Sequence, residues 1–123
     1  MWKDNNDKIY ELWSRLHQSH KRYPCQCPIC GYEAAHIYIR RYKDSDNRGA
    51  VWMWCSECKE YSHCTVCTPK WWANDDFVDL GKLLHTPDYL ESIREQVDNH
   101  INKTIDDYGR TNALQRLKVH NDG

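Results

Sequence analysis

The sequence predicts an α+β fold, in which a small antiparallel sheet is packed with one helix before it and several helices after it. Three runs of β-branched and aromatic residues predict the strands, at 34–42, 50–54 and 61–66. Apolar residues at helical spacing predict helices on either side, in 5–20 and beyond residue 74. Two Cys-x-x-Cys turns flank the first two strands and indicate that a metal ion holds the sheet together.

The first predicted helix covers residues 5–20. Its apolar stripe consists of four residues at helical spacing, Ile9, Leu12, Trp13 and Leu16. Asp4, Asn5 or Asn6 can cap its first turn, and Pro24 prevents it from continuing. We expect the stripe to pack against the sheet, and a helix that binds a partner is the alternative interpretation.

The three predicted strands are joined by short connections. In the first strand, Ile37 and Ile39 are two residues apart and therefore share one face. A polar turn at 43–49 leads into the second strand, which ends at the second pair of cysteines. The third strand ends before Pro69, because proline has no N–H to donate to a neighbouring strand.

Helices are predicted after the sheet. A short helix, capped within 74–76, carries the apolar residues Phe77, Val78, Leu80, Leu83 and Leu84. A longer helix begins with Thr86 as its cap and Pro87 at its first position, and Gly109 is expected to stop it. Its apolar face consists of Leu90, Ile93, Val97, Ile101 and Ile105. A last short helix carries Ala113, Leu114 and Leu117.

Length and composition limit the possible classes of protein. We interpret residues 1–123 as one domain, made of the helix 5–20, a metal-stapled sheet at 23–67 and a helical part at 74–119. Seventeen basic and eighteen acidic residues give a net charge of −1, so no overall field favours nucleic acid or an anionic membrane. No apolar run approaches the roughly 20 residues that span a bilayer. Seven cysteines without an apolar leader at the start of the chain predict a reducing, cytoplasmic location.

The spacing of four cysteines predicts a closed metal site. A Cys-x-x-Cys turn places two thiolates at neighbouring corners of a tetrahedron, and Zn²⁺ prefers such ligands at about 2.3 Å. Two such turns across a β-hairpin complete the set of four, Cys27, Cys30, Cys55 and Cys58. Four thiolates leave no open position for water or substrate, so this pattern indicates a structural metal and argues against metal catalysis.

Three further cysteines leave alternatives open. Cys25, Cys64 and Cys67 can form a second metal site together with His63, because Cys64 and Cys67 have the spacing of a metal turn. Against this, the predicted strand 61–66 sends Cys64 and Cys67 to opposite faces. Cys25 can also replace Cys27 as a ligand, since only one residue separates them in the sequence.

Two histidines on the predicted strands raise the possibility of an enzyme. His36 and His63 lie near thiols, but a Cys–His pair needs a third group to orient the imidazole. The sequence identifies no such group. We therefore expect both histidines to be hydrogen-bonded structural residues.

Aromatic and basic residues surround the predicted hairpin. Its tip is basic beside Tyr38 and Tyr42, through Arg40, Arg41, Lys43 and Arg48, with Asp44 and Asp46 as balancing charges. This pattern is typical of surfaces on which nucleic-acid bases stack, but we favour the alternative of a solvated hairpin whose charges balance. Trp71 and Trp72 are adjacent, so at least one of them is expected at the surface, where tryptophan often anchors an interface.

The segments Cys27-Pro28-Ile29-Cys30-Gly31 and Trp54-Cys55-Ser56-Glu57-Cys58 resemble the two knuckles of a zinc ribbon. The resemblance covers about residues 23–67 and implies one structural Zn²⁺ on the four cysteines named above. Zinc ribbons serve many unrelated functions, so the motif identifies an element of the fold and no activity.

The whole layout is similar to small stand-alone zinc-ribbon proteins of bacteria, some of which resemble toxin-immunity proteins. This resemblance implies a non-catalytic protein-binding module in the cytoplasm, plausible as an immunity protein that neutralises a toxin. An acidic surface suited to a basic partner is expected from Asp75, Asp76, Asp79, Asp88, Glu91, Glu95 and Asp98. The alternatives are a zinc ribbon that binds nucleic acid and a Cys/His enzyme.

Overall fold

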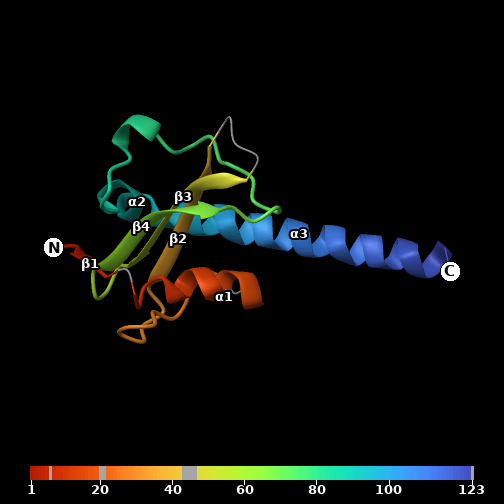
Figure 1. The fold of residues 1–123 in the computed structure, drawn as a ribbon, viewed down its shortest axis with the longest axis horizontal. Coiled ribbons are helices and arrows are strands. Elements are labelled where there is room, and N and C mark those ends of the chain that lie inside the picture. The colour runs from red at the N-terminus through yellow and green to blue at the C-terminus, as the bar shows by residue number, and fades with distance from the viewer. Residues whose placement is uncertain (6, 20–21, 43–46, 123) are drawn as a thin grey trace.

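A four-stranded sheet with helices on both faces forms the body of the molecule (Figure 1). The computed structural model describes residues 1–5, 7–19, 22–42 and 47–122, without the side chains of 17–19 and 109–122. The strands are β1 (Lys3–Asp4), β2 (Ala35–Arg41), β3 (Arg48–Cys55) and β4 (Glu60–Cys67). Their order in the sheet is β1-β4-β3-β2, and β2, β3 and β4 are antiparallel neighbours, so the predicted α+β class is confirmed.

The strand β1 is an addition to the three predicted strands. It pairs in parallel with β4, with Lys3 opposite Glu60 and Asp4 opposite Tyr61. The backbone N–H of Lys3 donates to the Lys59 carbonyl at 2.8 Å. Two polar residues carry no periodic pattern, so the sequence offers no signal for this edge strand.

Both faces of the sheet are covered, and each has its own core. Ile37 and Ile39 lie in one core as predicted, together with residues of the N-terminal helix. Tyr38, Trp52 and Trp54 point the other way, into a core shared with the segments after the sheet. Because β3 is buried on both faces, its sequence is almost continuously apolar instead of alternating with polar residues.

The N-terminal helix α1 (Glu11–Ser19) begins later than the predicted residue 5. The side chain of Asn5 accepts the Lys8 backbone N–H at 3.3 Å and holds a separate turn before the helix. The expected end at His20 lies outside the described residues. The predicted apolar stripe is confirmed, since Leu12 and Leu16 are fully buried.

The helices after the sheet differ from the prediction at three points. The short helix of 74–84 is reduced to the 3₁₀ turn η1 (Leu80–Lys82). The long helix is divided at Ile93 into α2 (Asp88–Ser92) and α3 (Arg94–Asp122), and Pro87 instead of the predicted Thr86 occupies the cap position of the first piece. Gly109 lies inside α3 and does not stop it, because glycine permits a left-handed end without imposing one. The last predicted helix is therefore part of α3.

In place of the predicted short helix, the segment is held by a contact with a distant strand, made by Asp75. Its side chain turns inward to pair with Arg40 at 3.1 Å and accepts the Val78 backbone N–H at 3.2 Å. The contact with the N–H of Val78 is that of a helix N-cap, but no helix follows directly, because the pair with Arg40 fixes Asp75 against β2.

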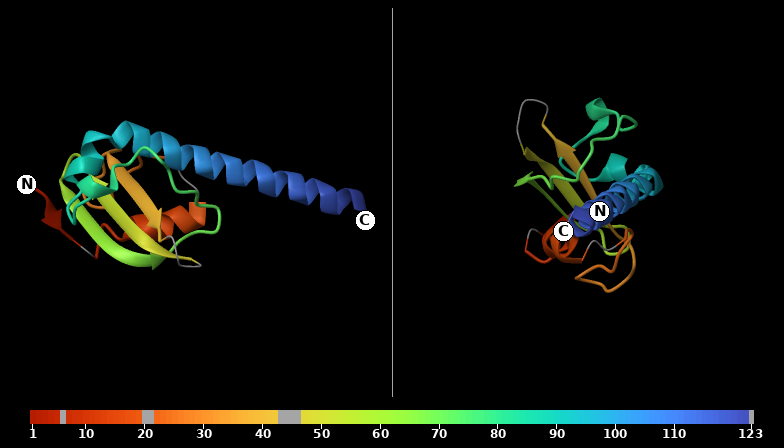
Figure 2. Two further views of the ribbon diagram at one scale, coloured as in Figure 1. Left: turned by 90° about the horizontal axis from the view of Figure 1, so that it is seen from above. Right: turned by 90° about the vertical axis from the view of Figure 1, so that its right-hand side faces the viewer.

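The helix α3 gives the molecule an elongated shape. Its first half packs against β2, with Val97 in one core and Ile101 and Ile105 in the other. Beyond these residues it extends away from the sheet, as the left view of Figure 2 shows. Within the described part of the chain, no helix combines the length and the apolar character needed to cross a membrane.

Candidate metal centre

Both Cys-x-x-Cys turns have the same backbone design. In the first, the N–H of Gly31 donates to the Cys27 carbonyl at 3.0 Å, and Gly31 has a φ of 82°. In the second, the N–H of Lys59 donates to the Cys55 carbonyl at 3.0 Å, and Lys59 has a φ of 63°. Each turn closes on itself and brings its two sulfur atoms together.

The sheet holds the two turns side by side. Ala35, at the start of β2, pairs with Cys55 at the end of β3. The other side of Ala35 forms a bridge with Cys25, two residues before the first turn. The backbone N–H of Ser56 adds a bond of 2.9 Å to the Ala34 carbonyl. Strand pairing therefore determines the distance between the predicted cysteine pairs.

Four sulfur atoms meet where the turns face each other. The Sγ atoms of Cys27, Cys30, Cys55 and Cys58 all lie within 4.8 Å of one another. Cys27 and Cys58 are separated by 3.8 Å, and Cys30 and Cys55 by 3.6 Å. A tetrahedral Zn²⁺ with Zn–S bonds of about 2.3 Å places its sulfur ligands about 3.8 Å apart. The cluster can therefore hold one zinc ion.

Burial acts against ionisation of these thiols. It raises the pKa of Cys55 and the pKa of Cys58. At Cys30 burial acts in the same direction, but hydrogen bonds from the Tyr32 backbone and from neighbouring thiols outweigh it and lower the pKa. A bound divalent cation stabilises the thiolate form at all four positions, so metal binding and thiol ionisation are coupled here.

A hydrogen-bonded chain ties the second turn to the C-terminal helices. The hydroxyl of Ser56, between the two cysteines, donates to Oε2 of Glu91 at 2.7 Å. His36 lies 2.8 Å from the same hydroxyl through Nε2 and 2.9 Å from Asp98 through Nδ1. The indole N–H of Trp54 also donates to Glu91, at 2.8 Å. Since His36 and Asp98 are buried, this chain positions the metal turn from inside the protein.

The partners in this hydrogen-bonded chain carry little signal in the sequence. The expectation that His36 is hydrogen-bonded agrees with these contacts, but Glu91 and Asp98 were assigned to an acidic surface. Asp98 lies three and seven residues before Ile101 and Ile105 and so on their face of the helix, which is the signal that indicates a buried carboxylate. Nothing in the sequence around Ser56 indicates its hydrogen bond to Glu91, apart from its position between two predicted ligands.

The remaining cysteines lie apart from the cluster. Cys25 is buried, Cys64 is half-buried against the core on the α1 side, and Cys67 is exposed. Alternation along β4 sends Cys64 and Cys67 to opposite faces of the sheet, as predicted. Within the described ranges, only the four-cysteine group brings three or more metal-ligating side chains together, and it contains Cys27 instead of Cys25.

The arginines of the hairpin are engaged in contacts inside the protein. Arg40 pairs with Asp75 at 3.1 Å and donates to the Tyr38 hydroxyl at 2.9 Å. Arg41 donates to the Pro69 carbonyl at 2.6 Å. Three other residues of the predicted tip lie outside the described part of the chain, Lys43, Asp44 and Asp46. Arg40 and Arg41 therefore join β2 to the segment that follows β4.

The expected acidic surface is divided between the interior and the exterior. Three of its carboxylates turn inward to partners, Asp75, Glu91 and Asp98. The exposed ones are Asp76, Asp79, Asp88 and Glu95. Of the adjacent tryptophans, Trp72 is buried and Trp71 is half-buried, so Trp71 is the one nearer the surface.

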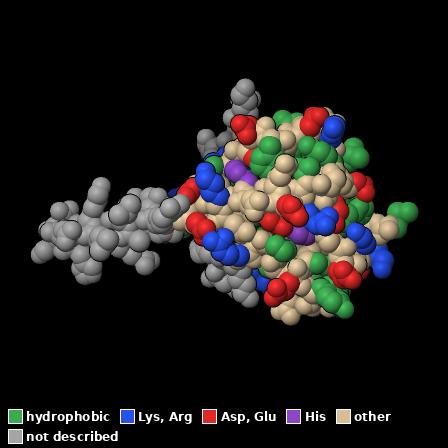
Figure 3. All heavy atoms as spheres, turned by 180° about the vertical axis from the view of Figure 1, so that it is seen from behind, with side chains coloured by type: hydrophobic (Ala, Val, Ile, Leu, Met, Phe, Trp, Pro, Cys, Tyr) green, Lys and Arg blue, Asp and Glu red, His purple; other side chains and the backbone are tan. Residues whose placement is uncertain are grey.

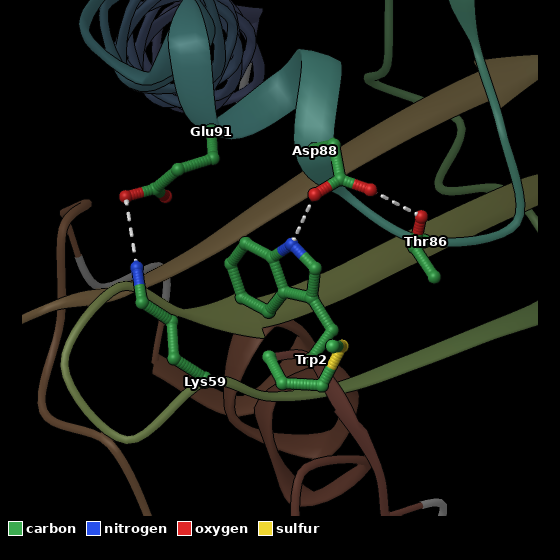
Figure 4. Close-up of a pocket in the computed structure, with 6 residues that line it drawn as sticks. Trp2, Lys59, Thr86, Asp88 and Glu91 are labelled. Atoms are coloured by element: carbon green, nitrogen blue, oxygen red, sulfur yellow. Dashed lines mark hydrogen bonds and ion pairs between the residues drawn. The ribbon is translucent and has the colours of Figure 1, made fainter.

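A pocket of about 410 Å³ lies between the N-terminus, the second cysteine turn and α2 (Figure 4). The Trp2 indole N–H donates to Asp88 at 2.7 Å, and the other oxygen of Asp88 accepts from Thr86 at 2.6 Å. The Lys59 ammonium lies 5.0 Å from the Trp2 ring centre and 3.9 Å from a Glu91 oxygen. The polar groups of this pocket are thus already bound to one another.

Comparison of the chain with protein-family models, with curated proteins and with solved structures found no match in any of the three. The four-cysteine cluster is compatible with a zinc-binding module. The interpretation of the site therefore depends on the residues themselves and on their geometry.

Proposed function

We propose that this chain is a non-catalytic protein-binding module, stabilised by one structural Zn²⁺ on Cys27, Cys30, Cys55 and Cys58. The four sulfur atoms within 4.8 Å of one another are the observation that carries the proposal. All four corners of the tetrahedron are supplied by the protein, so the ion has no open position for a substrate. The metal then contributes to folding, and binding belongs to the surface around it.

Metal analysis and native mass spectrometry test the metal part of the proposal. Reduced protein, purified without chelator, should contain one zinc ion per chain. The mass should fall by one zinc when the protein is denatured in acid, because the thiolates then become protonated. Protein with no metal under these conditions would contradict the proposal.

The binding surface proposed here lies on the segment between β4 and α2. Three large apolar side chains are exposed in it, Phe77 by 37%, Leu80 by 59% and Leu84 by 58%. Two exposed carboxylates, Asp76 and Asp79, lie in the same segment. We name these five residues the 76–84 surface. In Figure 3 hydrophobic side chains gather at the top of the molecule, over the part that contains η1.

An apolar centre with acidic neighbours suits a protein partner that is basic around an apolar patch. A toxin bound by a cytoplasmic immunity protein is one partner of this kind, and we propose it as the biological role. The proposal replaces the broader acidic surface of the sequence analysis, because Asp75, Glu91 and Asp98 are turned inward.

Capture with matched variants tests the binding surface. Zinc-loaded protein is used as bait in native cytosol, beside Leu80→Asp and the control Glu33→Lys. Glu33 is also exposed, in the loop before β2, which Figure 1 shows on the opposite side of the sheet from η1. A partner retained by the wild type and by Glu33→Lys, but lost with Leu80→Asp, supports the proposal. A partner lost only with Glu33→Lys would contradict it.

Two alternative functions remain as competing proposals. The nucleic-acid alternative is weakened by the internal contacts of Arg40 and Arg41 and by the absence of a strong positive net charge. It predicts binding to oligonucleotides that decreases steeply with salt. Salt-independent or undetectable binding would argue against it.

The enzyme alternative gains one observation, since Asp98, His36 and Ser56 have the connectivity of a catalytic triad. However, a hydroxyl has a single proton, and Ser56 donates it to Glu91 instead of to His36. We therefore interpret these hydrogen bonds as structural contacts that join the second cysteine turn to α2 and α3. A serine-reactive phosphonate probe that labels Ser56 in the zinc-loaded protein would overturn this interpretation.

A further inference from the structure

Two imidazole rings face each other on the side of the sheet away from α1. His63 of β4 and His85 of the segment before α2 bring their Nδ1 atoms to 3.1 Å. The ring centres are 5.0 Å apart, so the two Nδ1 atoms are closer together than the rings and lie on their facing edges. Neither residue belongs to the four-cysteine centre.

Neighbouring side chains hold both rings in place. His63 stacks on Trp52, with ring centres 4.3 Å apart and an angle of 14° between the planes. The Trp52 indole N–H donates to the Leu84 carbonyl at 2.9 Å and so anchors the backbone next to His85. The edge of the Tyr61 ring contacts His85, with ring centres 5.8 Å apart. The two nitrogens are therefore positioned by packing on a strand and by an anchored loop.

The separation of the nitrogens is that of two ligands on one metal ion. With metal–nitrogen bonds of about 2.0–2.1 Å, two imidazoles are about 2.9 Å apart at a right angle and about 3.4 Å apart in a tetrahedron. The observed 3.1 Å lies between these values. A single N–H···N hydrogen bond accounts for the same distance, so binding has to be measured.

The surroundings keep the lone pair of His63 available. Burial and the neighbouring His85 imidazole lower the pKa of His63, which favours the neutral form of the ring. Burial, followed by the carboxylates of Asp4 and Asp88, raises the pKa of Tyr61, whose ring edge contacts His85. Neutral imidazoles are preferred ligands of divalent transition-metal ions.

We propose that His63 and His85 form a second, open metal site, which binds one Ni²⁺, Cu²⁺ or Zn²⁺ ion through their Nδ1 atoms. Water completes the coordination of the ion, since two protein ligands leave several positions free. The bound ion links β4 to the loop that carries the 76–84 surface. Two imidazoles bind more weakly than four thiolates, so dialysis removes this ion before the structural zinc.

Titration with Ni²⁺ tests the site without disturbing the thiolates. Ni²⁺ is added to zinc-loaded, reduced protein and followed by calorimetry and by paramagnetic broadening of the histidine signals. We expect one equivalent to bind and to broaden His63 and His85 first. His85→Gln and His63→Gln should each weaken binding at least roughly tenfold, since each removes half of the protein ligands.

Two controls separate this site from other ligands. His100→Gln removes an imidazole that bonds the Ala73 carbonyl elsewhere in the molecule, and Cys67→Ser removes an exposed thiol. Both should leave the affinity for Ni²⁺ unchanged. His85 is exposed, so His85→Gln tests the site even where His63→Gln disturbs folding, which zinc content and circular dichroism report. Unchanged Ni²⁺ affinity in folded His85→Gln would overturn the proposal, as would no binding at millimolar Ni²⁺.

Discussion

The residue after each second cysteine has a positive φ, Gly31 in one turn and Lys59 in the other. Glycine adopts this conformation freely, whereas a side chain costs roughly 1–2 kcal/mol there. In the second turn Lys59 adopts this unfavourable conformation, and its side chain makes stabilising contacts with Trp2 and Glu91. Position 31 has no such compensation, which explains its glycine.

Alanine at two glycines should reveal two different costs. At Gly31 an added Cβ has no neighbour closer than 4.0 Å, so Gly31→Ala should lose only about 1–2 kcal/mol of folding free energy through its backbone conformation. At Gly49 the Cβ would lie 2.4 Å from the Arg40 carbonyl oxygen, within the sheet itself. Gly49→Ala should therefore be the more destabilising variant. Urea unfolding of both proteins measures the difference, and equal losses would contradict the steric argument.

Ligand cysteines and other cysteines should differ sharply on replacement. Cys30→Ser or Cys58→Ser removes a ligand, and the metal binding energy that is lost is largely folding energy. Both variants should lose zinc and native circular dichroism. Cys64→Ser, at a half-buried position outside the cluster, should keep its zinc and cost only about 1–2 kcal/mol. Similar melting of the two classes would show that the assignment of ligands is wrong.

At the scale of elements, the pair His36–Asp98 connects β2 to α3 across 62 positions of the sequence. Asp98→Ala leaves the buried His36 without its partner and should destabilise the fold by roughly 3 kcal/mol. Asp106→Ala is the matched control on the same helix, because its pair with Arg22 is largely exposed and should contribute less than about 1 kcal/mol. Thermal unfolding at constant zinc compares them. If Asp106→Ala lost as much folding free energy as Asp98→Ala, the proposed role of the His36–Asp98 pair would be refuted.

Gly109 provides a test of the length of α3. In a continuous helix, Gly109→Ala should raise the helix content and stabilise the protein by up to about 1 kcal/mol. At a helix end with positive φ, as expected from the sequence, the same change would destabilise by a similar amount. The sign of the change in free energy, measured by circular dichroism and urea unfolding, decides between the two.

Features determined by neighbouring residues were predictable at this scale. The four ligands follow from two four-residue turns, and the shared face of Ile37 and Ile39 follows from alternation. The lost helix at 74–84 was not predictable, because Asp75 bonds to Arg40, which is 35 positions earlier. Contacts made through the fold override the local helical propensity of that segment.

At the scale of the whole molecule, the class of the fold followed from the order of the patterns, but the surfaces did not. Which carboxylates face solvent depends on how α2 and α3 meet the sheet, and no local pattern records this. Glu91 and Asp98 therefore appeared equivalent to Asp76 and Asp88 in the sequence. The same holds for His63 and His85, whose approach needs the loop after β4 to fold back over Trp52.

The surface proposed for a partner makes a prediction about rates. Asp76 is exposed and Asp75 is not, so only the charge at Asp76 can be reversed without breaking the pair with Arg40. Asp76→Lys should slow association with a basic partner several-fold at low salt, and added salt should reduce the difference. Zinc content and melting temperature should stay at the wild-type values, since exposed substitutions away from special features have small effects.

Stopped-flow mixing with the captured partner measures this rate, with Glu33→Lys as the control of equal charge change. If the binding surface were the hairpin, Asp76→Lys would behave like the control, and Arg41→Ala would abolish binding instead. Arg41→Ala also removes the bond to the Pro69 carbonyl, so its melting temperature has to be compared first. A stable Arg41→Ala protein that fails to bind, beside an unaffected Asp76→Lys, would move the interface from the 76–84 surface to β2.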